Sequence, residues 1–223
     1  MFYGILIISL IITLSSQAFV SMTYSKTKKI KNINNLTGSE VARQILDNNG
    51  LSNVKVVETP GSLSDHYDPR SKVVRLSQDI YYGSSITSVS VAAHECGHAI
   101  QDKDKYIFMN IRSSIVPLVN FASYAGYFAI VIGFMASAMN LVWIGIIMEC
   151  IILLFQLVTL PVEFNASNRA VRILEDRGLL RQEELGMCKK VLSAAAMTYV
   201  AAAASSIISL LRLVLLFGRR RND

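Results

Sequence analysis

Two long runs of uncharged, mostly apolar residues dominate the pattern of this 223-residue chain. The first covers residues 2–20, and the second covers residues 113–148. About 20 apolar residues are enough to cross a bilayer, so the first run predicts one membrane helix. The second run is too long for one crossing. It predicts a helical hairpin, with one span over about 115–139 and another over about 141–160.

The first run has two interpretations, a cleaved signal peptide and a retained membrane anchor. A signal peptide needs a basic segment ahead of its apolar core, and no Lys or Arg precedes residue 20 here. A retained anchor is therefore the prediction. It is followed by four lysines, Lys26, Lys28, Lys29 and Lys31. Basic residues tend to remain in the cytoplasm, which places the following segment there.

A third apolar stretch lies near the C-terminus. Residues 191–211 carry no charge but begin with many alanines, and Arg212 interrupts the more lipophilic residues 210–217. The stretch is either another crossing or a helix packed on a soluble unit with an interfacial end. A crossing would carry Arg219–Arg221 out of the cytoplasm, against the usual distribution of basic residues. We therefore favour an incomplete crossing.

The polar segment between the first two runs has the pattern of a small α+β unit. Residues 37–49 have apolar positions at helical spacing. Residues 53–58 and 72–77 are short β-branched runs separated by turn residues, and both predict strands. The second strand is either internal or a free edge to which an extended peptide can add. Gly83-Ser84-Ser85 is the start signal of a further helix over residues 86–101.

Composition and charge narrow the class of protein. Hydrophobic residues make up 52% of the chain, which is typical of a membrane protein. The net charge of +6 is concentrated beside apolar segments, where basic residues suit anionic lipid headgroups better than nucleic acid. We therefore expect a lipid bilayer, and no nucleic acid, among the partners. Three cysteines give an odd count without paired spacing, so no disulfide framework is expected.

The candidate chemistry lies in His94-Glu95-Cys96-Gly97-His98, an H-E-x-x-H motif. Residues four apart share a helix face, so His94 and His98 can bind one metal ion. Glu95 is the expected general base, acting on a water at the position that the ion leaves open. Cys96 projects from another face and is expected to pack rather than to bind metal. The motif predicts a single Zn²⁺ ion as cofactor.

A catalytic zinc ion needs a third protein ligand. A membrane hairpin returns the chain to the side that it left, so residues just before and just after it face one compartment. This favours Glu163, which begins the helix predicted after the hairpin in the run LPVEFNASNRA. His66, the only other histidine, is the runner-up. Four acids that resemble solvated helix-end charges are rivals: Glu175, Asp176, Glu183 and Glu184.

Two supporting roles remain open in the sequence. A tetrahedral oxyanion needs a hydrogen-bond donor besides the metal, and the candidates are His66, Tyr67, Arg169 and Tyr199. The ligand imidazoles need partners for their second ring nitrogen, and the candidates are Ser167, Asp65 and Asp68. For each donor candidate, an ordinary role as a buried hydrogen-bonding group or a surface ion pair is equally compatible with the sequence.

Four segments stand out by their order and spacing: DHYDPRSKVVRLS, SVSVAAHECGHAIQ, TLPVEFNASNRA and AAMTYVAAA. Together they resemble the YugP-type membrane zinc metallopeptidases, from about residue 37 to residue 204. More distantly, the chain is similar to the HtpX-type membrane proteases. The resemblance implies a zincin-like fold, with a catalytic base at Glu95 and zinc ligands at His94, His98 and Glu163. Related zincins commonly carry an aspartate one helical turn after the glutamate ligand, where this chain has Ser167.

The sequence thus predicts an α+β, zincin-like metallopeptidase unit with an N-terminal transmembrane helix. A transmembrane helical hairpin is inserted between the helices that carry the metal ligands. The expected divisions are an anchor at 1–22, an α+β unit with the motif helix at 23–112, the hairpin at 113–161, a second part of the peptidase unit at 162–206, and an apolar segment with a basic tail at 207–223.

The expected function is that of a membrane-anchored zinc endopeptidase that cleaves polypeptides beside the bilayer, in membrane protein quality control. We expect a multi-pass protein of the cell membrane with its active site facing the cytoplasm. The alternative is a non-catalytic scaffold or regulatory subunit with a structural metal site, which has no need of Glu95 beside the first ligand. An intramembrane protease is disfavoured, because polar residues such as Asp102 and Asp104 flank the motif.

Overall fold

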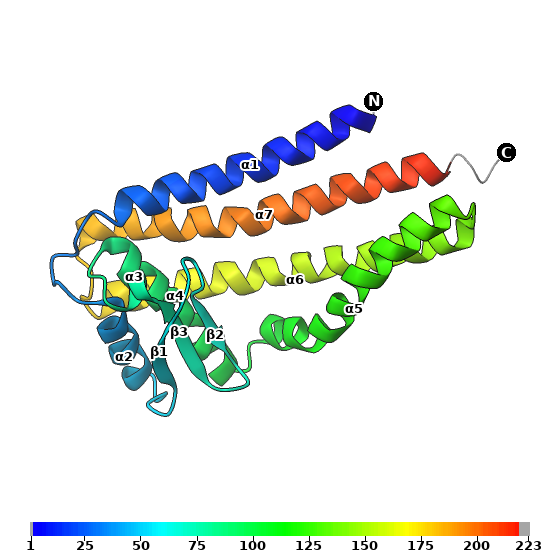
Figure 1. The fold of residues 1–223 in the computed structure, drawn as a ribbon. Coiled ribbons are helices and arrows are strands. Elements are labelled where there is room, and N and C mark those ends of the chain that lie inside the picture. The colour runs from blue at the N-terminus through cyan, green and yellow to red at the C-terminus, as the bar shows by residue number, and fades with distance from the viewer. Residues whose placement is uncertain (1, 219–223) are drawn as a thin grey trace. The chain divides into compact units, whose positions relative to one another are not determined.

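The computed structural model describes residues 2–218, with side chains from Gly4 onward, and is mostly helical with one small sheet (Figure 1). Its elements in chain order are α1 (Phe2–Thr27), α2 (Gly38–Asn48), β1 (Lys55–Thr59), β2 (His66–Asp68), β3 (Val73–Ser77), α3 (Gln78–Tyr81), α4 (Ile86–Lys103), α5 (Ile107–Met135), α6 (Met139–Asp176) and α7 (Gln182–Gly218).

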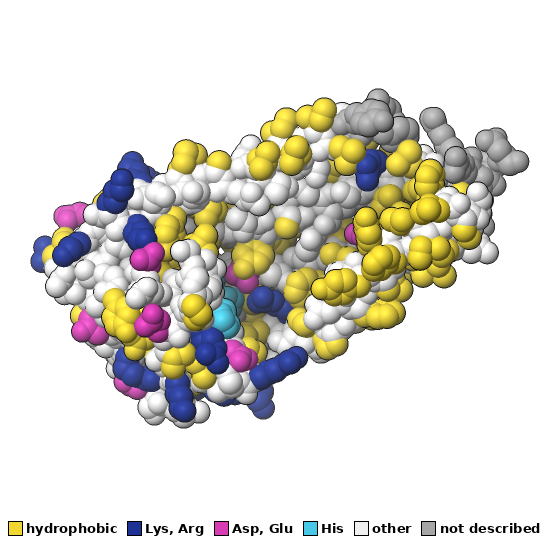
Figure 2. Space-filling model, in the orientation of Figure 1, with side chains coloured by type: hydrophobic (Ala, Val, Ile, Leu, Met, Phe, Trp, Pro, Cys, Tyr) yellow, Lys and Arg dark blue, Asp and Glu magenta, His cyan; other side chains and the backbone are white. Residues whose placement is uncertain are grey.

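The chain forms two compact units. One combines Met1–Gln17, Asn110–Leu160 and Met197–Asp223, and the other combines Ala18–Met109 with Pro161–Ala196. We call them the apolar unit and the sheet unit. Figure 2 shows hydrophobic side chains along the long helices and charged side chains gathered over the strands and the short helices.

Among the described residues, four helices are long and apolar enough to cross a membrane: α1, α5, α6 and α7. Exposed side chains in the apolar unit include Phe121, Tyr127 and Met135, which suits a lipid environment. α5 ends at Met135 and α6 begins at Met139, so the break lies slightly earlier than the predicted one between spans 115–139 and 141–160.

The last apolar stretch is part of α7. α7 is one unbroken helix to Gly218, with an 18-residue window of mean hydropathy 2.2, so its length and composition permit the full crossing that we disfavoured. The argument against a crossing depended on Arg219–Arg221, which lie outside the described residues. Inside the apolar unit, the Thr13 and Ser205 hydroxyls lie 3.2 Å apart and join α1 to α7.

The sheet has the strand order β1-β3-β2, with β1 parallel and β2 antiparallel to β3. β3 is therefore the central strand, and the idea that residues 72–77 form a free edge is wrong. The burial of Val73, Val74, Leu76 and Ser77 on both faces of β3 gives the physical reason, because a central covered strand carries apolar residues on both sides. β2 was not predicted, since three residues are too few to show a pattern.

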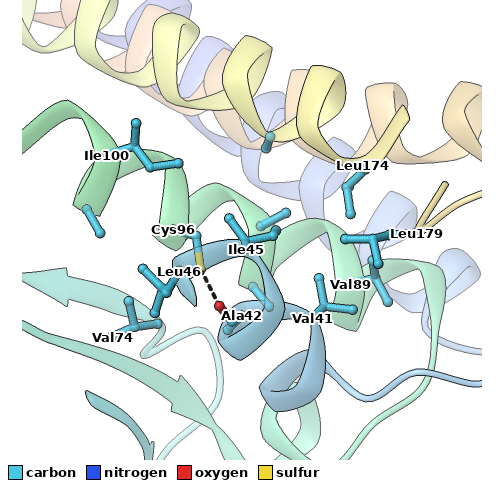
Figure 3. Packing of buried hydrophobic residues seen from close by; sticks show 14 of the residues in the cluster. Val41, Ala42, Ile45, Leu46, Val74, Val89, Cys96, Ile100, Leu174 and Leu179 are labelled. Atoms are coloured by element: carbon cyan, nitrogen blue, oxygen red, sulfur yellow. Dashed lines mark hydrogen bonds between the residues drawn. The ribbon is translucent and has the colours of Figure 1, made fainter. Parts of the chain in front are cut away.

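α2 and α4 build the core of the sheet unit. Thr37 caps α2 and forms a reciprocal capping box with Glu40. Val41, Ile45 and Leu46 of α2 are at most 1% exposed, and each contributes about 2 kcal/mol by its burial. Figure 3 shows this face of α2 packed with side chains of β3, α4 and α6.

α4 begins where the sequence predicts. Ser85 is its N-cap and accepts a hydrogen bond from the Ser88 amide. Cys96 is fully buried, and its thiol lies 3.6 Å from the Ala42 carbonyl oxygen (Figure 3). Burial raises the pKa of this thiol, so Cys96 is a packing residue, as expected.

α6 corrects one expectation about the third ligand. Glu163 does not begin a helix; it lies inside α6, two residues after Pro161. A proline removes one helical hydrogen bond. Breaking the helix there would leave more backbone groups unpaired, so the helix continues. Glu163 therefore does not interact with the positive end of a helix dipole, as a carboxylate at a helix N-terminus would.

Gly97 allows α4 and α6 to approach each other closely within the sheet unit. A Cβ atom at this position would lie 2.7 Å from the Ala166 carbonyl oxygen, which is backbone and cannot move aside easily. Gly97 precedes His98 directly and Ala166 follows Glu163 by three residues. The close approach of α4 and α6 therefore brings the H-E-x-x-H motif close to Glu163.

We expect Gly97→Ala to lower the free energy of unfolding by about 2 kcal/mol, because overpacking forces the two helices apart. Gly186→Ala is the matched control, since nothing lies within 4 Å of its Cβ position on the exposed face of α7. It should gain up to about 1 kcal/mol from helix propensity. Denaturant unfolding of both variants in detergent measures the difference, and equal effects would contradict the close approach.

Candidate metal centre

Three side chains from two helices converge in the sheet unit. His94 and His98 lie one turn apart on α4, and Glu163 faces them from α6. Their ligand atoms all lie within 4.8 Å of one another, and they are the one such group of three among the described residues. Glu163 Oε2 lies 3.2 Å from His94 Nε2 and 3.6 Å from His98 Nε2. The structure thus brings together the three ligands expected from the sequence.

The donor types, and the two distances that involve Glu163, fit a zinc ion. Two imidazole nitrogens and one carboxylate oxygen form a typical catalytic zinc set, which leaves the fourth position free for water. Donors about 2.0 Å from one tetrahedral ion lie about 3.3 Å apart. The two distances to Glu163 bracket this value.

The three side chains are shielded from solvent, and their charges depend on one another. The side chains of His94, His98 and Glu163 are 14%, 10% and 3% exposed. Burial raises the pKa of Glu163, but hydrogen bonds and charges of the two histidines outweigh it and hold this pKa well below its usual range. Burial lowers the pKa of His98, yet Glu163 and Glu95 raise it overall. The two histidines therefore favour the ionised form of the buried Glu163 carboxyl.

Each ligand imidazole has a partner on its second nitrogen. The Ser167 hydroxyl lies 3.2 Å from His94 Nδ1, as one of the sequence candidates predicted. Asp65 and Asp68 do not have this role. Asp65 accepts hydrogen bonds from the Ser77 amide and hydroxyl, and Asp68 accepts them from the Arg70 amide and the Ser71 hydroxyl.

The partner of His98 was missed in the sequence. The side-chain oxygen of Gln101 lies 2.9 Å from His98 Nδ1, and Gln101 is fully buried. The signal was present, because residues three apart are neighbours on a helix and Gln101 follows His98 by three. A polar side chain on the buried face of a helix needs such a partner.

The rival ligands lie elsewhere. His66 is exposed and its Nδ1 lies 2.8 Å from the Ser64 carbonyl oxygen, so the runner-up is not part of the cluster. Glu184 accepts hydrogen bonds from the Ile33 and Arg181 amides. The remaining three rivals are exposed: Glu175, Asp176 and Glu183.

Two candidate oxyanion donors are engaged in other contacts. The Tyr67 hydroxyl donates to Asp102 at 2.6 Å, and burial together with this bond raises the pKa of Tyr67. Arg169 donates to Asp104 at 2.5 Å and to Asn165 at 2.8 Å. Tyr199 lies on α7. The side chains of Tyr67 and Arg169 thus donate to Asp102, Asp104 and Asn165 in this structure.

Glu95 follows His94 directly on α4 and is 7% exposed. It lies outside the group of three ligand atoms. A carboxylate in this place is free to act on a water without ligating the ion itself.

Comparison with known proteins defines the class. Residues 2–218 match the protein family described as "Putative neutral zinc metallopeptidase", which is almost the whole chain. The chain belongs to this family of zinc metallopeptidases.

Among individual proteins, the chain is 46% identical over 208 residues to the "Putative membrane protease YugP" of Bacillus subtilis (strain 168). The match covers 93% of this chain and 92% of the Bacillus protein. No solved structure matches the chain. The expected resemblance to YugP-type membrane zinc metallopeptidases is thus confirmed.

Proposed function

We propose that this protein is a membrane-anchored zinc endopeptidase with a zincin-like catalytic unit. The observation that carries the proposal is the convergence of His94, His98 and Glu163 from two helices, with Glu95 beside the first histidine. These three residues hold a single ion, and Glu95 has the catalytic role. Zinc held by these residues would supply Lewis-acid chemistry, polarising the scissile carbonyl and lowering the pKa of a water molecule.

Glu95 performs both proton transfers of the proposed reaction. Glu95 accepts a proton from the attacking water while the water oxygen bonds to the carbonyl carbon. Glu95 then delivers this proton to the amide nitrogen as the carbon–nitrogen bond breaks, so that the amine leaves in neutral form. Burial of the site limits the access of other water, which strengthens the electrostatic interactions within it.

The four long apolar helices support a location in a membrane. The protein is proposed to be a multi-pass protein of the cell membrane that cleaves polypeptides beside the bilayer, in membrane protein quality control. Its catalytic unit is proposed to face the cytoplasm, because Lys26, Lys28, Lys29 and Lys31 follow α1.

Single cysteines near Lys29, Asp102 and Glu175 should all react with a labelling reagent from the cytoplasmic side. Labelling from opposite sides would contradict this arrangement.

Removal of the metal tests the proposed activity directly. We expect the purified protein in detergent to contain one zinc ion per chain and to cleave an unfolded casein substrate. A chelator such as 1,10-phenanthroline should reduce cleavage by at least 100-fold, and added zinc should restore it. Full activity in metal-free protein would contradict the proposal.

A further inference from the structure

Gln101 contacts both sides of the candidate metal centre. Its side-chain oxygen lies 2.9 Å from His98 Nδ1 on α4. Its amide nitrogen donates to the Val162 carbonyl oxygen at 2.8 Å and to the Asn165 side-chain oxygen at 3.0 Å, both on α6. Val162 directly precedes Glu163. One fully buried amide therefore joins a histidine ligand to the backbone that carries the carboxylate ligand.

The chemistry of these groups determines which way the amide points. A backbone carbonyl only accepts hydrogen bonds, so the Gln101 atom facing Val162 has to be the nitrogen. A guanidinium only donates, so the Asn165 atom that faces Arg169 Nε at 2.8 Å has to be an oxygen. That oxygen also requires the nitrogen of Gln101 as its second partner. Two independent contacts thus leave the Gln101 oxygen toward His98.

The orientation of Gln101 then determines the tautomer of His98. An oxygen of an amide accepts, so His98 Nδ1 has to carry the proton. His98 Nε2 keeps its lone pair and is directed toward the other two ligands. Glu163 lies 3.6 Å from His98 Nε2, whereas the Gln101 oxygen lies 2.9 Å from His98 Nδ1, so the shorter contact favours the proton on Nδ1.

His94 differs from His98 in this respect. Its Nδ1 contacts a hydroxyl, which can donate or accept, and its Nε2 lies within hydrogen-bond distance of Glu163 at 3.2 Å. In the zinc-free protein His94 therefore carries its proton on Nε2. His94 and His98 should therefore be opposite tautomers, and the contact of His98 with Gln101 causes this difference.

We infer that Gln101 is a positioning residue for the metal centre, holding His98 in the Nδ1–H tautomer and α6 at the correct distance. His98 donates to Gln101, Gln101 donates to the Asn165 side-chain oxygen, and that oxygen also accepts from Arg169, which is paired with Asp104 at the surface. The role of Gln101 in zinc binding and catalysis rests on the proposed function. The tautomer itself is a property of the zinc-free protein.

The tautomers can be measured by ¹⁵N NMR of zinc-free protein with labelled histidine at about pH 9, well above the ordinary histidine pKa of about 6.5. The chain has three histidines, and His66→Gln removes the signals of the exposed one. We expect one ring with its proton on Nδ1 and one with its proton on Nε2. Two Nε2–H rings in the wild-type protein would overturn the inference without any variant.

Gln101→Met should abolish the preference of His98 for Nδ1–H and weaken zinc binding 10- to 100-fold in a chelator competition, the usual effect of losing such a partner. Gln44→Met is the matched control, because Gln44 is exposed on α2 of the same unit. Retention of the Nδ1–H ring in Gln101→Met, or zinc affinity within twofold of wild type, would contradict the role.

A separate outcome applies to the proposed function. If wild-type protein bound no zinc but showed opposite tautomers, the peptidase proposal would fail and the positioning by Gln101 would stand. If it bound zinc but showed two Nε2–H rings, the reverse would hold.

Discussion

Glu95→Gln is expected to lower the rate of peptide cleavage by about 1,000-fold and to leave zinc binding unchanged. Positioned acid–base groups contribute about 10²- to 10⁴-fold to a rate, and the amide cannot accept the proton of the attacking water. The shape of the side chain is preserved, so the fold should not change. Casein cleavage and zinc content of the same preparation measure both quantities.

Glu183→Gln is the appropriate control, because it removes one negative charge from an exposed position at the start of α7. It should retain full activity. The experiment also separates an enzyme from a scaffold with a structural metal site. Equal cleavage by wild type and Glu95→Gln, or no cleavage by either protein despite bound zinc, would contradict the catalytic assignment.

Glu163→Gln is expected to lose zinc as well as activity. The amide keeps the size of the side chain but removes the only negative charge from the three ligand atoms. Loss of an outer partner costs 10- to 100-fold in metal affinity, so loss of a proposed direct ligand should cost more than 100-fold. Competition with a fluorescent chelator measures the affinity.

Glu175→Gln on the exposed part of α6 is the control for this variant and should bind zinc normally. The two glutamate variants should therefore differ in zinc binding, although both lose activity. Glu95→Gln keeps the ion and loses the reaction, whereas Glu163→Gln loses both. Normal zinc binding by Glu163→Gln would exclude Glu163 as a ligand.

Much of the sheet unit could be predicted from local patterns. Thr37 with Glu40, and Ser85 before an apolar run, are start signals that act through neighbouring backbone groups, so they are visible in the sequence. The two histidines are also local, because their spacing alone places them on one helix face. These features need no knowledge of distant contacts.

The remaining features depend on distant contacts. β3 is central because β1 and β2 both pair with it, and its sequence is compatible with either position. Glu163 lies within a continuous helix because α6 tolerates Pro161, which a local reading takes as a boundary. Gln101 has visible helical spacing, but its two partners on α6 are about 60 residues away in sequence.

The separation of the ligands along the chain also has a consequence for biosynthesis. His98 and Glu163 are 65 residues apart, which a ribosome at 5–20 residues per second covers in about 3–13 s. During that interval the nascent polypeptide carries both imidazoles but no third ligand. A newly made copy therefore lacks one of the three residues of the proposed metal site until the predicted hairpin between them has been synthesised.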